Sequence, residues 1–215
     1  MTRLVIDSVD LPLGDEMPDN LSLSDRGLSV TGLDEEVVIE SQSKCYPQHN
    51  TALEGLYLSG GMYCTQCEPE GFRRIGLFPD RPDVMSVFTV KIEASLKFPQ
   101  LLSNGNLIES GMVGSGRHFA IWHDPHPKPS YLFAIVAGDL DCVTSPYVTA
   151  SGREVDLRIY VEKGNADLTT HAMDSLIRSM QWDEQEYGLE YDLDLFQIVA
   201  VSHFNMGAME NKGLN

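Results

Sequence analysis

The chain has 215 residues, of which 42% are hydrophobic and 22% are charged, and this composition excludes collagen and low-complexity disorder. Its charge is strongly acidic, because 15 Lys and Arg stand against 32 Asp and Glu for a net charge of −17. Such a chain repels phosphate groups, so we expect neither nucleic acid nor an anionic membrane surface as a partner. A cationic or amine-bearing ligand is easier to bind.

Targeting and redox signals are few. The chain has no run of about 18 apolar residues, so we expect no membrane-spanning helix. Asp7 and Asp10 interrupt the apolar stretch that a signal peptide needs in residues 1–14, and the lack of a secretory signal favours the cytoplasm. The cysteines are too few for a dense disulfide framework: Cys45, Cys64, Cys67 and Cys142.

The first 140 residues are expected to form many short strands. Alternating or apolar runs bounded by turn residues predict strands over 4–9, 27–31, 36–40, 88–96, 101–103, 107–109, 117–123 and 131–137. Asn104-Gly105-Asn106 is a strong hairpin signal, and the proline-rich residues 124–129 are expected to form a loop. Strands with turns every 8–12 residues or so are typical of a β-sandwich or a twisted, saddle-like pair of sheets. We therefore expect residues 1–140 to be a β-domain.

The pattern changes after residue 140. A strand is expected over 155–161, a helix over 165–187 between an N-cap at Asn165 and Gly188, and a strand buried on both faces over 193–201. The apolar stripe of the helix contains Leu168, Ala172, Met173, Leu176, Ile177 and Met180. Strand, helix and strand form an α/β unit, so we expect a second domain at 141–215. One such unit cannot cover both faces of its sheet, so this domain is expected to be incomplete.

Three isolated patterns are open to two interpretations. Cys64 and Cys67 form a CxxC that suits zinc or redox chemistry, but small core residues are the simpler reading, and the acidic residues that follow would raise the thiol pKa. The pair His123 and His126 is able to bind zinc, although the flanking prolines spread the side chains. His203, near the end of a buried strand, is expected to be a core histidine.

Two further stretches combine charge with tight turns. Residues 67–74 place two acidic and two basic side chains around a turn, where a rigid loop often binds ligand. Residues 204–215 follow a buried strand directly. There, Gly207 and Ala208 leave room for a ligand backbone, and Glu210 sets a carboxylate beside the core. Either stretch alone is also compatible with a surface turn.

Together these stretches resemble a known family. Gly207-Ala208-Met209-Glu210-Asn211 resembles the GxMEN exopeptidase motif of the zinc aminopeptidases of the aminopeptidase N type. Residues 66–74 (QCEPEGFRR) and the following DRP at 80–82 resemble the other amine-binding segment of that family. The match is nearest to the bacterial alanyl aminopeptidase branch and runs from about residue 50 to residue 215. Both motifs in the right order make it specific.

The resemblance implies a substrate-binding set of Gln66, Glu68, Met206, Gly207, Ala208, Met209, Glu210 and Asn211. In this family Glu68 and Glu210 would bind the free α-ammonium of a peptide, so peptides with a free N-terminus are the expected partners. A cis Glu68–Pro69 bond is a further hypothesis, because such a bond turns the chain sharply and would aim Glu68 into the site.

The remaining members of the set bind the rest of the substrate. Gly207 and Ala208 would offer backbone groups to the peptide chain, in the manner of an added strand. Gln66 and Met206 would line the pocket for its first residue. The implied fold is mainly β, with a β-sandwich or saddle-like N-terminal domain, its opening segment missing, followed by the first α/β elements of an incomplete thermolysin-like domain.

One departure from the family limits these expectations. The family hydrolyses peptides with zinc held by HExxH and a later Glu, and HExxH does not occur in these 215 residues. Zinc is therefore expected in the full-length enzyme but not in this chain, and no catalytic residue is expected here. The chain is expected to be a fragment that is inactive without the remainder of its catalytic domain.

Two alternatives stay open at this point. The chain is also compatible with a non-catalytic β-module that binds peptides or amines through Glu68 and Glu210. A metal or redox protein built on Cys64 and Cys67 is the second alternative, and it predicts stoichiometric bound metal.

Overall fold

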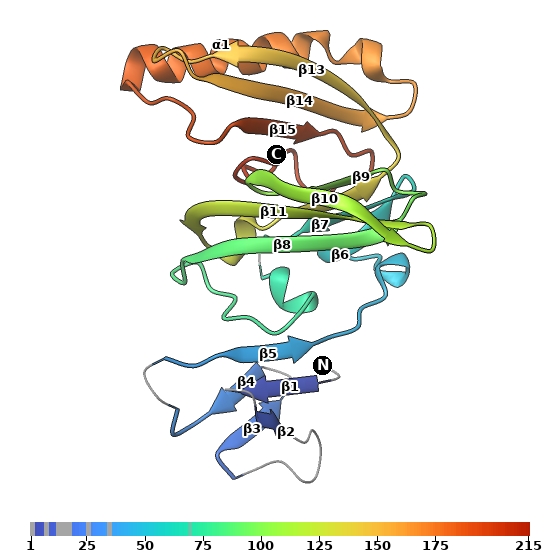
Figure 1. Cartoon of the computed structure of the whole chain (residues 1–215), viewed down its shortest axis with the longest axis vertical. Helices are drawn as coiled ribbons and strands as arrows, with labels where there is room; N and C mark the ends of the chain where they lie inside the picture. Colours follow the sequence, from blue (N-terminus) through green and yellow to red (C-terminus); the bar gives the residue numbers. More distant parts are fainter. Residues whose placement is uncertain (1–2, 7–8, 12–18, 25–26, 34–35, 69) are drawn as a thin grey trace.

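The computed structural model describes residues 3–6, 9–11, 19–24, 27–33, 36–68 and 70–215, the first two ranges by their backbone alone. Its strands form five sheets within these residues. The N-terminal strands lie at one end of the molecule and the long helix at the other (Figure 1). In the described part of the chain no helix is long and apolar enough to cross a membrane.

Two small sheets form the N-terminal end. One contains β1 (Arg3–Ile6), β2 (Val9–Leu11) and β5 (Ile39–Gln42), and the other is the hairpin of β3 (Leu21–Ser24) and β4 (Gly27–Val30). The single strand predicted over 4–9 is wrong, because β1 and β2 pair antiparallel with each other. The strand predicted over 36–40 is observed as β5, which begins three residues later and ends two residues later. Local alternation does not show where a chain reverses.

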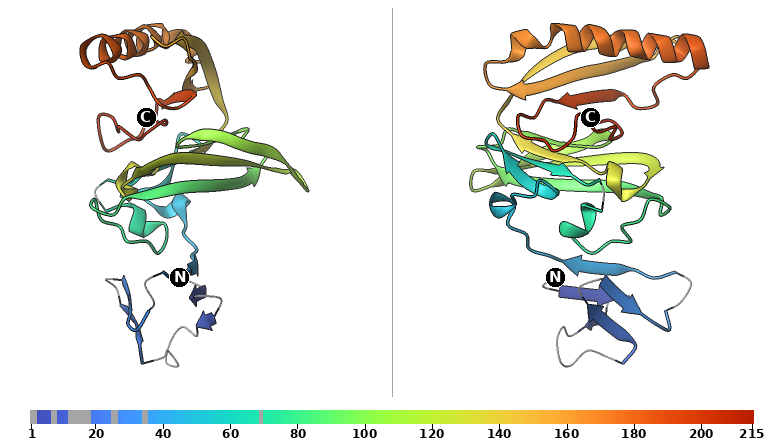
Figure 2. Two further views of the ribbon diagram at one scale, coloured as in Figure 1. Left: turned by 60° about the vertical axis from the view of Figure 1, so that its left-hand side comes forward. Right: turned by 180° about the vertical axis from the view of Figure 1, so that it is seen from behind.

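Two antiparallel sheets in the middle of the molecule form the expected sandwich (Figure 2). The first contains β6 (Gly55–Ser59), β7 (Met62–Gln66), β12 (Ile135–Gly138) and β9 (Gln100–Ser103); the second contains β10 (Asn106–Gly114), β11 (Arg117–Lys128) and β8 (Ser86–Ser95). Tyr57, Trp122 and Val136, drawn from both sheets, are buried in one cluster. Burial of apolar surface, at about 25 cal/mol per Å², is the main force that joins the sheets.

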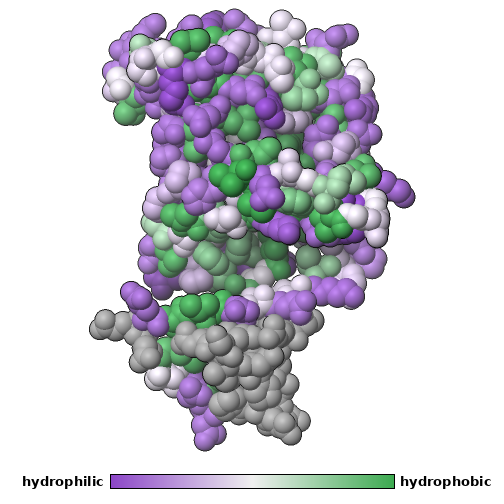
Figure 3. Space-filling view, in the orientation of Figure 1, coloured by the Kyte–Doolittle hydropathy of each residue, from purple (hydrophilic) through white to green (hydrophobic). Residues whose placement is uncertain are grey.

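The second sheet has an open edge at β10. Four apolar side chains of β10 are exposed: Leu107, Ile108, Met112 and Val113. Hydrophobic and hydrophilic residues are mixed over the middle of the molecular surface (Figure 3). Register shifts interrupt the pairing of β10 with β11 at 107/109 and 112/114. Such bulges make an edge strand a poor template for pairing with another chain.

The hairpin predicted at Asn104-Gly105-Asn106 is wrong. β9 pairs with β12 and β10 pairs with β11, so the turn carries the chain from one sheet to the other. Gly105 has φ +87°, and a Cβ there would lie 2.2 Å from the carbonyl oxygen of His123. The glycine is needed for this close approach of two backbones. The predicted turn does occur, but the strands on its two sides belong to different sheets. Leu101 and Leu102 of β9 are buried in the sheet that contains β12.

The loop predicted at 124–129 is also wrong, because β11 continues to Lys128. A bulge between Asp124 and Lys128 accommodates the two prolines. Asp124 and Lys128 are almost completely buried, 0% and 2% exposed, and form an ion pair at 3.0 Å. The Lys128 ammonium also lies 4.4 Å from the ring centre of Phe88. The strand predicted over 131–137 is a 3₁₀ helix, Ser130–Leu132, followed by β12.

The last sheet contains the expected α/β unit. β13 (Leu140–Val148) pairs antiparallel with β14 (Glu154–Glu162), and β14 pairs parallel with β15 (Leu195–Val199) after the crossover helix α1 (Thr170–Tyr187). One face of β14 packs on α1, where Leu157 and Ile159 are buried. From the opposite face, Tyr160 joins the core of the sandwich. The sheet of this unit therefore lies between α1 and the sandwich.

The boundaries of this unit differ from those predicted. The residue before α1 is Thr169, not Asn165, because a 3₁₀ helix, Ala166–Leu168, comes first. The 3₁₀ helix places Leu168 outside the apolar stripe, so that it is 78% exposed, and Ala172 is exposed as well. Gly188 ends the helix at φ 63° as predicted. The strand predicted over 193–201 is shorter, since β15 spans only Leu195–Val199.

The difference between Leu168 and Leu176 gives a test of this correction. Leu176→Ala is expected to lower the free energy of unfolding by about 2–5 kcal/mol, because it opens a cavity under α1. Leu168→Ala is expected to change it by less than about 0.5 kcal/mol. Urea unfolding followed by circular dichroism measures both, and equal losses would show that Leu168 belongs to the core.

Candidate functional site

A cavity of about 480 Å³ lies between the sandwich and the C-terminal part of the chain. One wall comes from β7 and the start of β12, with Cys64, Thr65 and Ala134. The other wall comes from β15 and the residues that follow it. Five of the predicted site residues line this second wall: Met206, Gly207, Ala208, Met209 and Asn211. The second sequence motif thus forms one side of a cavity.

The exposure of the motif residues alternates. Met209 and Asn211 are buried, whereas Gly207, Ala208 and Glu210 are exposed. A Cβ added to Gly207 would meet no atom within 4 Å, so there is open space beside its backbone. An extended peptide is able to approach such a backbone and pair with it.

The chain after the motif is fixed to β15. Gln197 N donates to Gly213 O at 3.2 Å, and Asn215 N donates to Gln197 O at 2.9 Å, in a parallel arrangement. The Lys212 ammonium lies 2.7 Å from both carboxylate oxygens of Asp192. Residues 211–215 are therefore held as an addition to the edge of the last sheet, and this fixes the end of the motif.

The loop that carries Glu68 is fixed by Asp80. Arg73 donates to one Asp80 carboxylate oxygen from its backbone N at 3.0 Å and from Nε at 3.1 Å. Ser130 Oγ donates to the other oxygen at 2.5 Å. Asp80 is 8% exposed, so this hydrogen-bonded carboxylate ties the loop to the sandwich.

Gln66, Glu68 and Glu210 do not line the cavity. Glu68 is half-buried in the turn after β7, and Glu210 is exposed. Gln66 is 1% exposed, and neither atom of its side-chain amide has a hydrogen-bond partner among the described residues. The joint binding of an amine by Glu68 and Glu210 stays a prediction. The cis hypothesis for Glu68–Pro69 involves a residue outside the described ones.

The CxxC cysteines are buried and free. Burial raises the pKa of the Cys64 thiol to about 11, although its hydrogen bond with Tyr57 lowers it in part. Burial raises the pKa of Cys67 to about 12, and the Asp80 carboxylate adds to the effect. The expected direction is confirmed, but the main cause is burial and not the acidic residues that follow. Thiols of this kind are poor nucleophiles.

His123 and His126 each have a different side-chain partner. His123 Nδ1 lies 2.8 Å from Thr89 Oγ1, and His126 Nε2 lies 3.3 Å from an Asp192 carboxylate oxygen. Within the described ranges no three His, Cys, Asp or Glu side chains are grouped to hold a metal ion. His203 is exposed, so its prediction as a core residue is wrong. It follows the paired part of β15, where the chain has left the sheet.

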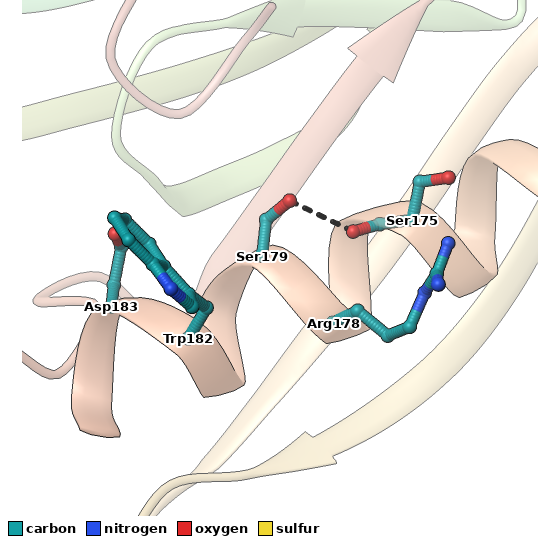
Figure 4. A pocket seen from close by; sticks show the side chains of 5 residues that line it. All are labelled: Ser175, Arg178, Ser179, Trp182 and Asp183. Carbon is teal, nitrogen blue, oxygen red and sulfur yellow. Dashed lines mark hydrogen bonds between the residues drawn. The ribbon is translucent and has the colours of Figure 1, made fainter. Parts of the chain in front are cut away.

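A second hollow lies on the outer face of α1 (Figure 4). Only side chains of the helix itself line it: Ser175, Arg178, Ser179, Trp182 and Asp183. Ser179 Oγ donates to the Ser175 carbonyl of its own helix at 2.9 Å, and Arg178 pairs with Asp174. No group from another element converges on this hollow, so we do not assign it a site.

Several residues that shape the cavity were not predicted as site residues. Thr65 joins β7 to β12, since its Oγ1 accepts a hydrogen bond from Ile135 N at 2.9 Å. Asn104, noted only as a turn residue, accepts a hydrogen bond from Ala134 N at 2.8 Å. Neither role leaves a signal in local sequence, because both partners lie at least 30 residues away.

Comparison with known proteins identifies the class. The profile of the Peptidase M1 N-terminal domain matches residues 42–132, and the profile of the Peptidase family M1 domain matches residues 171–215. Both profiles describe consecutive parts of one kind of peptidase. The chain belongs to the M1 peptidase family.

Individual relatives agree with this assignment. Aminopeptidase N of Caulobacter vibrioides is 58% identical over 188 residues, and that of Escherichia coli is 56% identical over 189 residues. Each alignment covers 87% of this chain and 22% of the relative, so the chain spans about a fifth of the length of these relatives. The crystal structure of Legionella pneumophila aminopeptidase A in complex with aspartic acid superposes with a TM-score of 0.88 at 33% identity, over 99% of this chain and 25% of that one.

The buried thiols give a direct test of the CxxC assignment. At pH 8 we expect iodoacetamide to modify exposed Cys45 in the folded protein but to leave Cys64 and Cys67 unmodified, because both are inaccessible and protonated. Cys64 and Cys67 ionise at a lower pH in the unfolded chain than in the native protein. Their burial as neutral thiols therefore favours the folded state fully below about pH 8.5, and this contribution is lost as the pH rises through the native pKa values of about 11 and about 12. Mass spectrometry of alkylated peptides measures the outcome. Modification of Cys64 or Cys67 at the rate of Cys45 would contradict burial.

Proposed function

We propose that this chain is the part of an aminopeptidase that recognises the free N-terminus of a peptide. The observation that supports the proposal most directly is the cavity wall built by residues 206–209 and Asn211. Two relatives are named Aminopeptidase N, and the similar aminopeptidase A was solved with aspartic acid, an amino acid with a free α-ammonium group.

Two carboxylates would provide the recognition. An α-amino group has a pKa near 8 and is largely charged at neutral pH, so it attracts Glu68 and Glu210. Only a chain end carries this charge, and a site that requires it removes one residue at a time. A fixed loop favours such recognition, and hydrogen bonds to Asp80 fix the loop of Glu68.

The other predicted residues would bind the substrate beyond its amine. The open backbone at Gly207 and Ala208 is suited to pair with the peptide chain. Met206 lines the cavity and is 43% exposed, so it is able to contact the first side chain. The unpartnered amide of buried Gln66 is suited to accept a ligand group after a small movement. Met209 and Asn211 close the same wall.

Hydrolysis itself needs groups that these residues do not supply. The described residues hold no cluster of metal ligands, and HExxH is absent from the sequence, so the described part of the chain does not fit a zinc ion. On the family resemblance we propose that zinc and its ligands belong to a part of the protein outside these 215 residues. The cytoplasmic location stays a prediction.

We also propose the domain division at residues 140 and 141. β13 begins at Leu140, and β13 to β15 form a sheet separate from the sandwich. The two family profiles leave residues 133–170 unmatched between them, and this gap contains the proposed division.

The amine-binding role is tested by removing one negative charge at a time. In the protein expressed from its complete coding sequence, Glu68→Gln and Glu210→Gln are each expected to weaken binding of an alanyl peptide about tenfold to a hundredfold, the value of a charge-assisted hydrogen bond. Titration calorimetry with the peptide and with its N-acetylated form measures this, and the acetylated form is expected to bind weakly to all variants.

Glu70→Gln is the matched control, because Glu70 lies two residues from Glu68 and its side chain is 70% exposed beside Arg73. Its binding is expected to equal that of the unmodified protein. Equal binding of the free and acetylated peptides would refute the proposal.

The 215-residue chain alone is expected to show no aminopeptidase activity. HExxH is absent from the sequence, so we expect no metal-activated water and no hydrolysis of an alanyl anilide above the background rate. Turnover that a chelator abolishes would contradict this expectation and would require metal ligands within these residues.

A further inference from the structure

The buried side chain of Asn104 joins the two walls of the cavity. Its Nδ2 donates to Lys212 O at 2.9 Å and to Leu132 O at 3.0 Å, and its Oδ1 accepts from Ala134 N at 2.8 Å. Asn104 is 2% exposed. Ala134 lines one wall, and Lys212 directly follows Asn211, which lines the other. One amide thus bonds to both walls.

A second buried amide supports the same segment from the side of β15. Gln197 is 0% exposed, and its Nε2 donates to Ser103 O at 3.1 Å and to Gly213 O at 3.2 Å. The two backbones approach closely here, since a Cβ on Gly213 would lie 3.2 Å from Gly105 N. The carbonyl oxygens at 212 and 213 are therefore both bonded by side chains that lie at or beside the 103–105 turn.

We propose that Asn104 is a positioning residue for the motif at 207–211, and that its amide sets the distance between the two walls of the cavity. Release of Lys212 O would free the end of the motif, because an unpaired buried carbonyl is costly and would turn toward water. The expected effect of Asn104 on substrate binding rests on the proposed function. Its expected effect on the mobility of the segment after the motif is independent of that function.

Asn104→Asp tests the proposal with almost no change in shape. The carboxylate keeps the acceptor for Ala134 N but places an oxygen against two carbonyl oxygens. Asn106→Asp is the matched control in the same turn, because Asn106 bonds to Asp194 and not to residues 206–215. Asn104→Ser is a second variant, which removes the amide without adding charge.

The measurement is hydrogen exchange by mass spectrometry, in the protein expressed from its complete coding sequence. In either Asn104 variant we expect the amides of 209–215 to exchange at least about tenfold faster, the effect of a lost buried hydrogen bond, while those of β8 and β11 do not change. With an alanyl anilide we expect KM to rise about tenfold and kcat to change little, because the motif binds substrate and transition state alike. Asn106→Asp is expected to change neither quantity.

Each other outcome has a definite meaning. Unchanged exchange at 209–215 in both variants overturns the proposal. Uniformly faster exchange, or failure of both variants to fold, also overturns it, because Asn104 would then support the whole fold. An unmodified protein without aminopeptidase turnover refutes the proposed function, and the exchange result still decides the role of Asn104.

Discussion

The arrangement of the site depends on the hydrogen bonding of one irregular segment buried between two sheets. Residues 211–215 lie between the sandwich and β15, and Asn211, Gly213 and Leu214 are buried there. Buried backbone groups must find partners, and here side-chain amides supply them: Asn104 bonds Lys212 O, and Gln197 bonds Gly213 O. The position of the motif before this segment follows from these bonds.

Hydrogen bonds to a buried carboxylate likewise fix the loop that carries Glu68. The loop after β7 has no regular structure around Glu68, yet it is bound to the sandwich because Asp80 accepts hydrogen bonds from Arg73 and Ser130. Close by, the buried Asp124–Lys128 pair is stabilised by mutual charge and by the ring of Phe88. A buried ion pair is stable only when such partners are in place. Charged groups here bind an irregular loop and the bulged end of β11 to the sandwich.

Much of the fold was predictable because it follows from local patterns. The alternation over 88–96 predicted β8, whose inward residues are more buried than their neighbours. The change to helical spacing predicted α1 and the parallel unit around it. The predictions that failed concern partners: the turn at Asn104 joins different sheets, and residues 124–128 continue a strand despite two prolines. Strand pairing is decided by burial against distant residues, which no short window contains.

The sequence by itself determined the family and the set of candidate residues, because the two charged motifs are specific in type and order. It also determined that a strand, a helix and a strand follow the β-domain. Only the tertiary structure decided that residues 206–209 and Asn211 form a cavity wall opposite Cys64 and Ala134. These walls are about 70 to 150 residues apart in the chain. They meet because two sheets pack together and two side-chain amides satisfy the carbonyl groups between them, and such contacts exist only in the folded chain.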